Sequence, residues 1–424
     1  MKHCLHIAAM GLVLGYFYLD SDRVDAGTLV IEGECNGKDG TASARDPCKW
    51  NPDLRFVVVG DTGRGPSNPG QKWVADAMAS YCASQGCQFV HLVGDNIYPK
   101  GVTSEDADEQ FHAKFHDPYS NVNMPFWAAL GNHDYGGDPV VGGHGLDHAA
   151  AAAQIAYANG SHNQTEHGNK FRMPDDEYIV RFGPPGKPYS EHYVYNTPLA
   201  NFGLPRFPLI APPSDPIYDP SRKVQRPWKF AFGHHPYISN GFHSEFAYTL
   251  GGGTSLGTGA TQMIEDEICG KADIYFAGHE HDAQMLMETC GPDNGKQTQL
   301  AIIGTGHEAL GRSPDPSIVL PFLHANLLYD DTAIGFLWVN ANDDTVTLKF
   351  IGCDRYLHLP TVPTDPETWC ANPDHIGDDH SLGTEWSPWY TLFAMECTRS
   401  PKKDTGLQNC EEIQPDRTPN METL

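Results

Sequence analysis

Five glycines, each at the end of a predicted strand, are followed by a residue whose side chain can bind a metal ion. Carboxylate, amide and imidazole groups suit iron, manganese and zinc, and no thiolate is needed. Two such ions about 3.5–4 Å apart form the usual clamp for in-line phosphoryl transfer, and a carboxylate must bridge ions held that close. Asp95 is the natural bridge, so these residue types predict a two-metal site for phosphoryl transfer. The five pairs are Gly60-Asp61, Gly94-Asp95, Gly131-Asn132, Gly233-His234 and Gly278-His279.

Each pair closes a short apolar run that is typical of a buried strand. Between several of these runs, the residues follow the spacing that is typical of a helix, at 71–82, 109–116 and 261–268. Alternating strands and helices predict parallel pairing with crossover helices, and therefore an α/β fold. The carboxyl ends of such strands meet at one edge, where glycine allows sharp turns, so the five pairs should share one site. The predicted strands are residues 56–59, 89–93, 126–130, 228–232 and 274–277, with further strands at 299–303 and in a hairpin over 335–351.

The longer motifs around these pairs resemble a known family. GDTG at 60–63, GDNIY at 94–98, GNHD at 131–134, GHHP at 233–236 and GHEH at 278–281 stand in the order of the five blocks of calcineurin-like metallophosphoesterases. Tyr98, the wider run GDNIYPKGV and QIAY at 154–157 make the chain similar to the small, tartrate-resistant type of purple acid phosphatase. The resemblance covers roughly residues 54–352. It implies a multi-layer sandwich of two mixed β-sheets flanked by helices.

This resemblance also implies a metal centre and a reaction. One site would hold Fe(III) and the other a divalent ion, either Fe, Zn or Mn. Metal-bound hydroxide would attack phosphorus in line and hydrolyse phosphate monoesters without a covalent phosphoenzyme. His133 or His243 would protonate the departing alkoxide, with Asp134 orienting His133. The implied Fe(III) ligands are Asp61, Asp95, Tyr98 and His281, and the implied ligands of the divalent ion are Asp95, Asn132, His234 and His279.

The chain departs from the family pattern in three places. His235 stands where an aromatic residue is usual, a proline-rich stretch at 196–227 replaces a helix, and the tail from residue 360 has no counterpart. Two other functions stay open: a Mn or Zn phosphodiesterase or nucleotidase of the same fold, and a non-catalytic scaffold. Tyr98 argues against the first, because a phenolate favours a ferric ion. The complete set of seven ligands argues against the second.

Other polar residues have simpler interpretations. The Gly-His-x-Pro pattern favours His234 as the ligand and leaves His235 as a wall residue. Residues 374–380 predict a solvated acidic loop. Residues 136–170 are rich in Gly, His and Ala and predict a long surface excursion, in which the solvated histidines are His144, His148, His162 and His167.

The formal net charge of -26 argues against partners that need a basic surface. Nucleic acid and anionic membranes are both in this class, and no membrane partner is expected after signal cleavage. The expected partner is the small phosphate ester implied by the phosphatase resemblance. Because this substrate is itself an anion, bound metal ions must reverse the sign of the charge locally. The oligomeric state stays open.

The N-terminus and the cysteines predict a secreted or extracytoplasmic protein. Residues 1–26 resemble a signal peptide, followed by a catalytic domain at 27–359 and a Pro/Cys-rich extension at 360–424. Ten of the 11 cysteines remain once Cys4 leaves with the signal, and this even number predicts disulfides in an oxidising compartment. The sequence does not fix their pairing. Asn159 and Asn163 each start a sequon and are candidate glycosylation sites.

Overall fold

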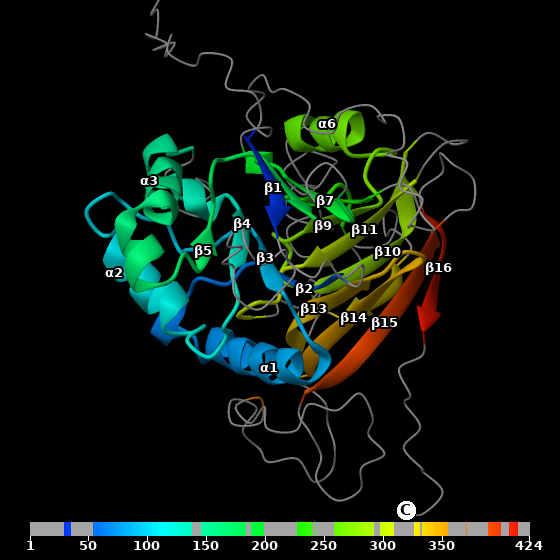
Figure 1. Cartoon of the computed structure of the whole chain (residues 1–424), viewed down its shortest axis with the longest axis horizontal. Helices are drawn as coiled ribbons and strands as arrows, with labels where there is room; N and C mark the ends of the chain where they lie inside the picture. Colours follow the sequence, from blue (N-terminus) through cyan, green and yellow to red (C-terminus); the bar gives the residue numbers. More distant parts are fainter. Residues whose placement is uncertain are drawn as a thin grey trace, which may run out of the picture.

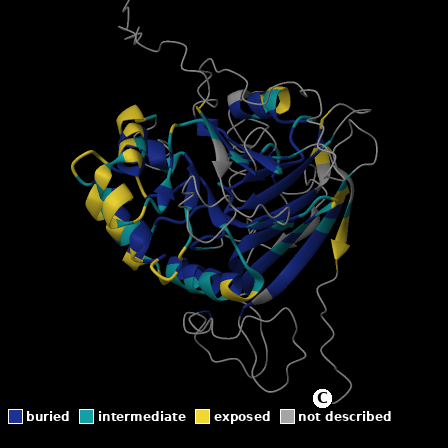
Figure 2. Ribbon diagram, in the orientation of Figure 1, coloured by how far each residue is buried: buried dark blue, intermediate teal, exposed yellow. Residues whose placement is uncertain are grey.

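Two β-sheets of eight strands each face one another in the computed structural model, with helices on their outer sides (Figure 1). Burial follows this arrangement, because the strands between the layers are mostly buried and the outer helices are partly exposed (Figure 2). The structure describes residues 29–34, 54–137, 146–183, 188–198, 227–239, 241, 258–291, 297–308, 326–330, 333–354, 370, 389–399 and 407–413.

The sheet that contains β2, the β2 sheet, is parallel in one half and antiparallel in the other. Its strands lie in the order β16, β15, β14, β13, β2, β3, β4, β5. The parallel half consists of β2 (Leu54–Val59), β3 (Phe89–Val93), β4 (Phe126–Ala129) and β5 (Phe171–Arg172). The antiparallel half consists of β13 (Ala333–Ala341), β14 (Thr345–Asp354), β15 (Tyr390–Arg399) and β16 (Leu407–Ile413). Covered on both faces, β2, β3 and β4 have the nearly continuous apolar sequences expected of buried parallel strands.

The second sheet, the β8 sheet, is mixed. Its strands lie in the order β1, β6, β7, β8, β9, β11, β10, β12. The parallel run consists of β7 (Ser190–Val194), β8 (Trp228–Phe232), β9 (Ile274–Ala277) and β11 (Thr298–Ile303). The remaining strands are β1 (Leu29–Glu34), β6 (Tyr178–Phe182), β10 (Ala283–Cys290) and β12 (Asn326–Asp330). The two sheets together confirm the predicted sandwich of two mixed sheets.

Helices connect the parallel strands, as the alternating pattern predicts. α1 (Pro69–Gln85) links β2 to β3, and α6 (Thr258–Glu267) precedes β9. Beyond β5 lie α2 (Ala107–Phe111), the π-helical turn η2 (His112–His116) and α3 (His148–Asn159) (Figure 1). Short turns complete the set: η1 (Gly65–Ser67), η3 (His133–Tyr135) and η5 (His162–Glu166). Among the described helices, none has the length and apolar character to cross a membrane.

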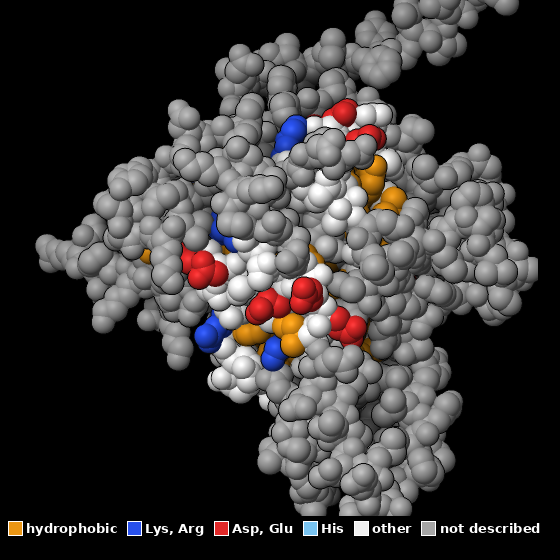
Figure 3. All heavy atoms as spheres, turned by 90° about the vertical axis from the view of Figure 1, so that its right-hand side faces the viewer, with side chains coloured by type: hydrophobic (Ala, Val, Ile, Leu, Met, Phe, Trp, Pro, Cys, Tyr) orange, Lys and Arg blue, Asp and Glu red, His pale blue; other side chains and the backbone are white. Residues whose placement is uncertain are grey.

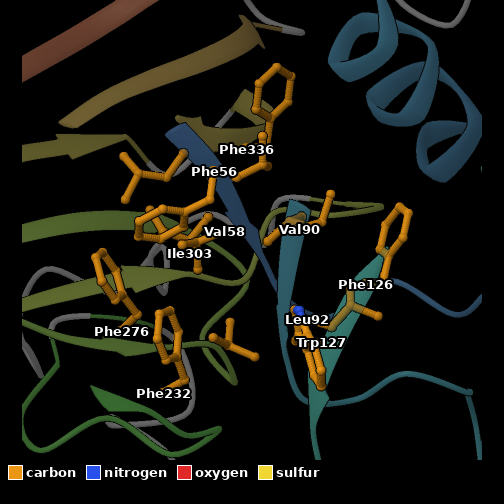
Figure 4. Packing of buried hydrophobic residues seen from close by; sticks show 14 of the residues in the cluster. Phe56, Val58, Val90, Leu92, Phe126, Trp127, Phe232, Phe276, Ile303 and Phe336 are labelled. Atoms are coloured by element: carbon orange, nitrogen blue, oxygen red, sulfur yellow. The ribbon is translucent and has the colours of Figure 1, made fainter. Parts of the chain in front are cut away.

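An aromatic cluster fills the space between the two sheets (Figure 4). Phe56 and Phe89 of the β2 sheet stack with ring centroids 5.3 Å apart. Phe232 and Phe276 of the β8 sheet stack at 5.2 Å, and Phe56 meets Phe276 edge to face at 6.3 Å. Such geometries add to the apolar area that the rings bury, so the cluster holds the layers together.

Two fully buried histidines lie inside this aromatic cluster. Nε2 of His91 on β3 is 2.9 Å from Nδ1 of His192 on β7, so this hydrogen bond joins the two sheets. His91 also stacks on Phe232, with ring centroids 3.7 Å apart. Burial holds the pKa of both imidazoles well below the ordinary value, and His91 lowers the pKa of His192 further. Both rings are therefore neutral in the folded protein.

The prediction of a surface excursion over residues 136–170 is wrong for most of its described part. α3 occupies residues 148–159, and its Ala151 and Tyr157 side chains are buried. Five consecutive alanines favour this helix, because alanine is the best helix former. The Asp147 side chain caps it by accepting hydrogen bonds from the backbone N–H groups of Ala149 and Ala150.

The C-terminal extension is also more closely built into the fold than its weak periodicity predicts. β15 pairs with β14 along its length, and β16 pairs with β15. Trp389, Phe393 and Met395 belong to the main hydrophobic core. The tail therefore contributes two strands and core side chains to the β2 sheet.

Disulfides join cysteines that are close in sequence. The described bonds are Cys82–Cys87, Cys269–Cys290, Cys353–Cys370 and Cys397–Cys410. Cys353–Cys370 attaches the tail to β14, and Cys397–Cys410 joins β15 to β16. Four disulfides fit a protein of an oxidising compartment. The predicted signal peptide, Cys35 and Cys48 lie outside the described residues.

Candidate metal centre

The five predicted strand ends converge on one side of the sandwich. Asp61, Asp95 and Asn132 follow β2, β3 and β4 of the β2 sheet, whereas His234 and His279 follow β8 and β9 of the β8 sheet. Backbone hydrogen bonds join these loops: Asp61 N donates to Gly94 O at 3.1 Å, and His279 N donates to the Asp61 carboxylate at 2.8 Å. The site therefore lies where the two sheets meet.

Three of these residues have backbone conformations that residues other than glycine rarely adopt. The φ angles of Asp61, Asp95 and His279 are 56°, 53° and 72°. Left-handed conformations of this kind are strained for residues with a Cβ, and they persist where the surrounding structure enforces them. Gly131 shows how tight the loops are, since a Cβ there would lie 2.2 Å from Asp95 Oδ1. The loops thus aim these side chains inward at the cost of backbone strain.

Three polar side chains form the half of the site on the Tyr98 side, the tyrosine half. The Tyr98 hydroxyl donates to Asp61 Oδ1 at 2.9 Å. Nε2 of His281 lies 3.1 Å from the Tyr98 oxygen and 3.4 Å from Asp61 Oδ1. All three side chains are buried. Phenol, carboxylate and imidazole thus direct their donor atoms to one point.

Asn132, His234 and His279 form the other half, the amide half. Asn132 Oδ1 lies 2.9 Å from His234 Nε2 and 3.1 Å from His279 Nδ1. The two imidazole nitrogens are 3.2 Å apart. His234 Nδ1 is 2.9 Å from the carbonyl oxygen of Val93, to which it donates, so Nε2 faces the centre with its lone pair.

Asp95 lies between the two halves. Its Oδ1 is 3.4 Å from His234 Nε2 and accepts the backbone N–H of His133 at 2.8 Å. Donor atoms of Asp61, Asp95 and His234 all lie within 4.8 Å of one another, a spacing that one metal ion can span. The seven side chains singled out by the sequence are therefore brought together, with one carboxylate in the central position.

The electrostatics of this cluster favour bound cations. Burial lowers the pKa of His281, but contacts with Asp61 and Glu308 outweigh it and raise the pKa to about 10. Burial also raises the pKa of Tyr98 well above its ordinary value, and the Asp61 and Asp95 charges raise it further. Without metal, the site thus retains protons that a cation would displace. This chemistry fits a metal centre.

The net charge of -26 agrees with a site that must attract anions through metals. On the face shown in Figure 3, the described side chains include several acidic ones with a few Lys and Arg among them. A substrate phosphate approaching a protein of this net charge is repelled unless local positive charge captures it.

The prediction that Asp134 orients His133 is wrong. His133 Nδ1 lies 2.6 Å from the carbonyl oxygen of Pro99 and donates to it. That contact leaves Nε2 on the Asp95 side, 3.9 Å from its Oδ2. A backbone carbonyl, and not a carboxylate, thus fixes the His133 ring.

Asp134 serves a different purpose in the structure. Its fully buried carboxylate accepts the backbone N–H groups of Asn96, Ile97 and Gly131 at 2.8–3.2 Å, and the Gln154 side-chain amide at 2.7 Å. These bonds tie the loop after β3 to the loop after β4. Asp134 therefore braces the backbone that carries Asp95 and Asn132. Burial and the nearby Asp95 charge raise the pKa of Asp134 to about 6.

Two other predicted residues have different outcomes. His235 is buried beside the amide half, with its ring centroid 4.7 Å from that of His279 and Nδ1 3.0 Å from Thr197 Oγ1. It is a wall residue, as the sequence predicts. His243 lies outside the described residues.

Sequence reasoning missed three charged or polar residues beside the tyrosine half. His307 and Glu308 follow β11, and Arg64 lies in the loop after β2. A signal was present, because Gly306-His307 repeats the pattern of a glycine and a metal-capable residue after a predicted strand. Here the glycine does not follow the strand directly, since Gly304 and Thr305 intervene.

The candidate glycosylation sites differ in accessibility. Asn159 is exposed, whereas Asn163 is fully buried. The Asn163 side-chain amide donates to the carbonyl oxygens of Ala158 at 2.8 Å and Phe171 at 2.7 Å. The nitrogen that would carry a glycan is thus engaged inside the fold.

The family profile for calcineurin-like phosphoesterases matches residues 54–283 of this chain. Tartrate-resistant acid phosphatase type 5 of Homo sapiens is 30% identical over 330 residues, which cover 71% of this chain and 87% of that protein. The corresponding protein of Sus scrofa is 25% identical, with 62% of this chain and 73% of that protein covered. Purple acid phosphatase 17 of Arabidopsis thaliana is 23% identical, with 69% and 82% covered.

Proposed function

This chain belongs to the calcineurin-like phosphoesterases and is a phosphatase similar to purple acid phosphatases, and we propose that it is a secreted acid phosphatase that hydrolyses phosphate monoesters at an Fe(III)–M(II) centre. The observation that carries this proposal is the convergence of seven donor side chains from the ends of five strands. Their donor atoms lie 2.9–3.4 Å apart within each half of the site.

The two halves differ in chemistry, which supports two different ions. In the tyrosine half, phenolate and carboxylate are hard, anionic donors that favour Fe(III). In the amide half, one neutral amide and two imidazoles suit divalent Fe, Zn or Mn. Asp95, placed between the halves, would serve both ions. The ligands assigned to Fe(III) are Asp61, Asp95, Tyr98 and His281, and those assigned to the divalent ion are Asp95, Asn132, His234 and His279.

When bound, the two ions would hold the phosphate, activate water and stabilise the charge that develops during in-line displacement. The side chains of this chain would do the rest. His133 would act as the general acid, because its Nδ1–H is held by Pro99 and its Nε2 faces the site with 22% of the side chain exposed. His243 stays a second candidate for this role.

Secretion is proposed from the N-terminal sequence together with the four disulfides. Disulfides persist in oxidising compartments and are rare in the cytosol. Residues 1–26 would be removed as the signal, and the mature chain would comprise the catalytic domain and the extension that completes the β2 sheet. The mass of the exported protein tests this directly.

The deciding experiment combines metal analysis with a visible spectrum. A phenolate bound to Fe(III) donates charge on excitation, so the purified oxidised protein should be violet, contain two metal equivalents and hydrolyse an aryl phosphate. Tyr98→Phe should abolish the visible band while retaining some hydrolysis. A colourless, fully active enzyme with two equivalents of Mn or Zn would refute the ferric assignment. Preference for diesters or nucleotides would then favour the alternative phosphodiesterase.

Asp95→Asn tests the bridging role. Because one carboxylate would serve both ions, this variant should lose both metals or nearly all of its turnover. Asp344→Asn, at an exposed residue of the β13–β14 turn beside the opposite end of β2 from Asp61, is a control with the same chemical change. A variant at Asp95 that keeps two metals and normal turnover would exclude the bridge.

A further inference from the structure

A cluster of charged and polar side chains lies directly behind the tyrosine half of the metal centre. It consists of Arg64, His307 and Glu308, which we term the RHE cluster. His307 and Glu308 follow a tight turn after β11. A Cβ at Gly304 in this turn would lie 2.0 Å from the carbonyl oxygen of Glu280 and 2.8 Å from Asp61 Oδ2. The turn is therefore fitted closely against the loops that carry the proposed ligands.

Glu308 is the centre of this cluster. Its Oε1 lies 2.9 Å from His307 Nε2, 3.4 Å from His281 Nδ1 and 3.5 Å from Arg64 Nη2. His281 presents its other nitrogen, Nε2, to Tyr98 and Asp61. One carboxylate oxygen thus faces the side of the His281 ring that points away from the proposed ion.

Arg64 holds this carboxylate in place, and His307 anchors Arg64. His307 Nδ1 donates to the carbonyl oxygen of Asp61, so its Nε2 can accept from Arg64 Nε at 3.2 Å. The Arg64 guanidinium also stacks over the Tyr98 ring, with Cζ 4.2 Å from the centroid. A cation over the ring stabilises negative charge on the phenol oxygen. The cluster therefore contacts the Tyr98 and His281 side chains and the backbone of Asp61.

The spacing of His281, His307 and Glu308 would also allow a metal ion to bind among them. Arg64 argues against this use. Its guanidinium lies within 3.5 Å of both Glu308 and His307 and already provides the positive charge that such a cation would bring. A positioning role fits the contacts better than a third metal site.

We propose that Glu308 is a positioning residue for the tyrosine-side metal: it accepts the Nδ1–H of His281 and thereby directs the Nε2 lone pair toward the ion, while Arg64 neutralises Glu308 and supports Tyr98. This inference rests on the proposed metal centre. Carboxylates behind metal-binding histidines fix the tautomer and the ring orientation, and they make the imidazole a stronger donor. The cluster would therefore raise the affinity of one metal position and leave the other unchanged.

The test measures Zn²⁺ affinity by competition with a chelator, using the full-length protein and two substitutions of one residue. Glu308→Ala removes both the acceptor and the charge, and should weaken one of two Zn²⁺ equivalents by about 10–100-fold. Glu308→Gln keeps an acceptor oxygen and should weaken the same equivalent less. Glu105→Ala, an exposed glutamate in the turn before α2, is the matched control and should bind Zn²⁺ like the wild type.

Several results would overturn the proposal. Unchanged affinity for both equivalents in Glu308→Ala would exclude the positioning role. Three Zn²⁺ equivalents in the wild type and two in the variant would show that the cluster is itself a metal site. If Glu308→Ala fails to fold, Glu308→Gln and Arg64→Gln decide, and normal affinity in both would also exclude the role. A wild-type protein that binds fewer than two ions would instead refute the proposed metal centre.

Discussion

Acidification should destabilise this fold through the two histidines buried between its sheets, and His91→Gln should remove half of that effect. Both rings are neutral in the native state, because burial holds the pKa of each well below the ordinary value of 6.5. In the unfolded chain both become protonated once the pH falls below about 6.5. The unfolded state then binds more protons than the native state. The free energy of unfolding is therefore not reduced by the pair above that pH. It declines as the pH falls toward the lower native pKa values of the two histidines.

The size of the effect follows from the number of groups. Each neutral buried histidine lowers the free energy of unfolding by about 1.4 kcal/mol per pH unit below 6.5. Between pH 6.5 and about pH 5, each ring therefore costs about 2 kcal/mol and the pair about 4 kcal/mol. Glutamine cannot titrate, but its Nε2 can replace the ring nitrogen that contacts His192. The variant loses the stacking on Phe232 at every pH, which is a constant difference.

Urea unfolding of the metal-loaded proteins, followed by circular dichroism at several pH values, measures the effect. The stability difference between wild type and His91→Gln should shrink by about 2 kcal/mol from pH 6.5 to about pH 5. Titrating groups that both proteins share cancel in this difference. His148→Gln, at an exposed histidine, is the control and should give no such trend. A difference for His91→Gln that stays constant within about 0.5 kcal/mol would refute the assignment of a neutral, buried His91.

Two further predictions concern the site and its supports, and a third concerns a buried sequon. His133→Ala should lower kcat about 10²–10⁴-fold with metal content intact, and the loss should be smaller for substrates with acidic leaving groups; an equal loss on all substrates would argue against a general acid. Asp134→Ala leaves several buried N–H groups without their acceptor and should reduce the free energy of unfolding by about 3 kcal/mol or more in urea titrations, whereas a purely catalytic Asp134 would leave stability unchanged. Asn163 should carry no glycan when the protein is expressed in a eukaryotic host, and a glycopeptide at Asn163 in the folded protein would contradict its burial. Asn163→Ala should lower the free energy of unfolding by about 2–4 kcal/mol, because two buried carbonyl groups lose their donors.

Much of the parallel core could be predicted from the sequence, because the signals are local. A strand buried on both faces must be apolar throughout, and the chain must turn where it ends, so Phe56 to Gly60 and Phe89 to Gly94 are recognisable by themselves. Other elements gave weaker local signals. β10 and β15 pair with neighbours on both sides, yet their sequences mix polar with apolar residues and show no clean period. The helix α3 was missed although its alanines and Asp147 were visible.

The sequence alone determined which residue types end the core strands, and with them the donor set and the class of chemistry. Only the tertiary structure decided which groups support that donor set. Tyr98 meets His281 across 183 residues, and His307 reaches the backbone of Asp61 across 246. No local pattern encodes such contacts, because they depend on how two sheets pack and on which loops the packing brings together. For the same reason Asp134, adjacent to His133 in sequence, turned out to brace two loops, while the carbonyl of Pro99, in the loop after β3, fixes the histidine.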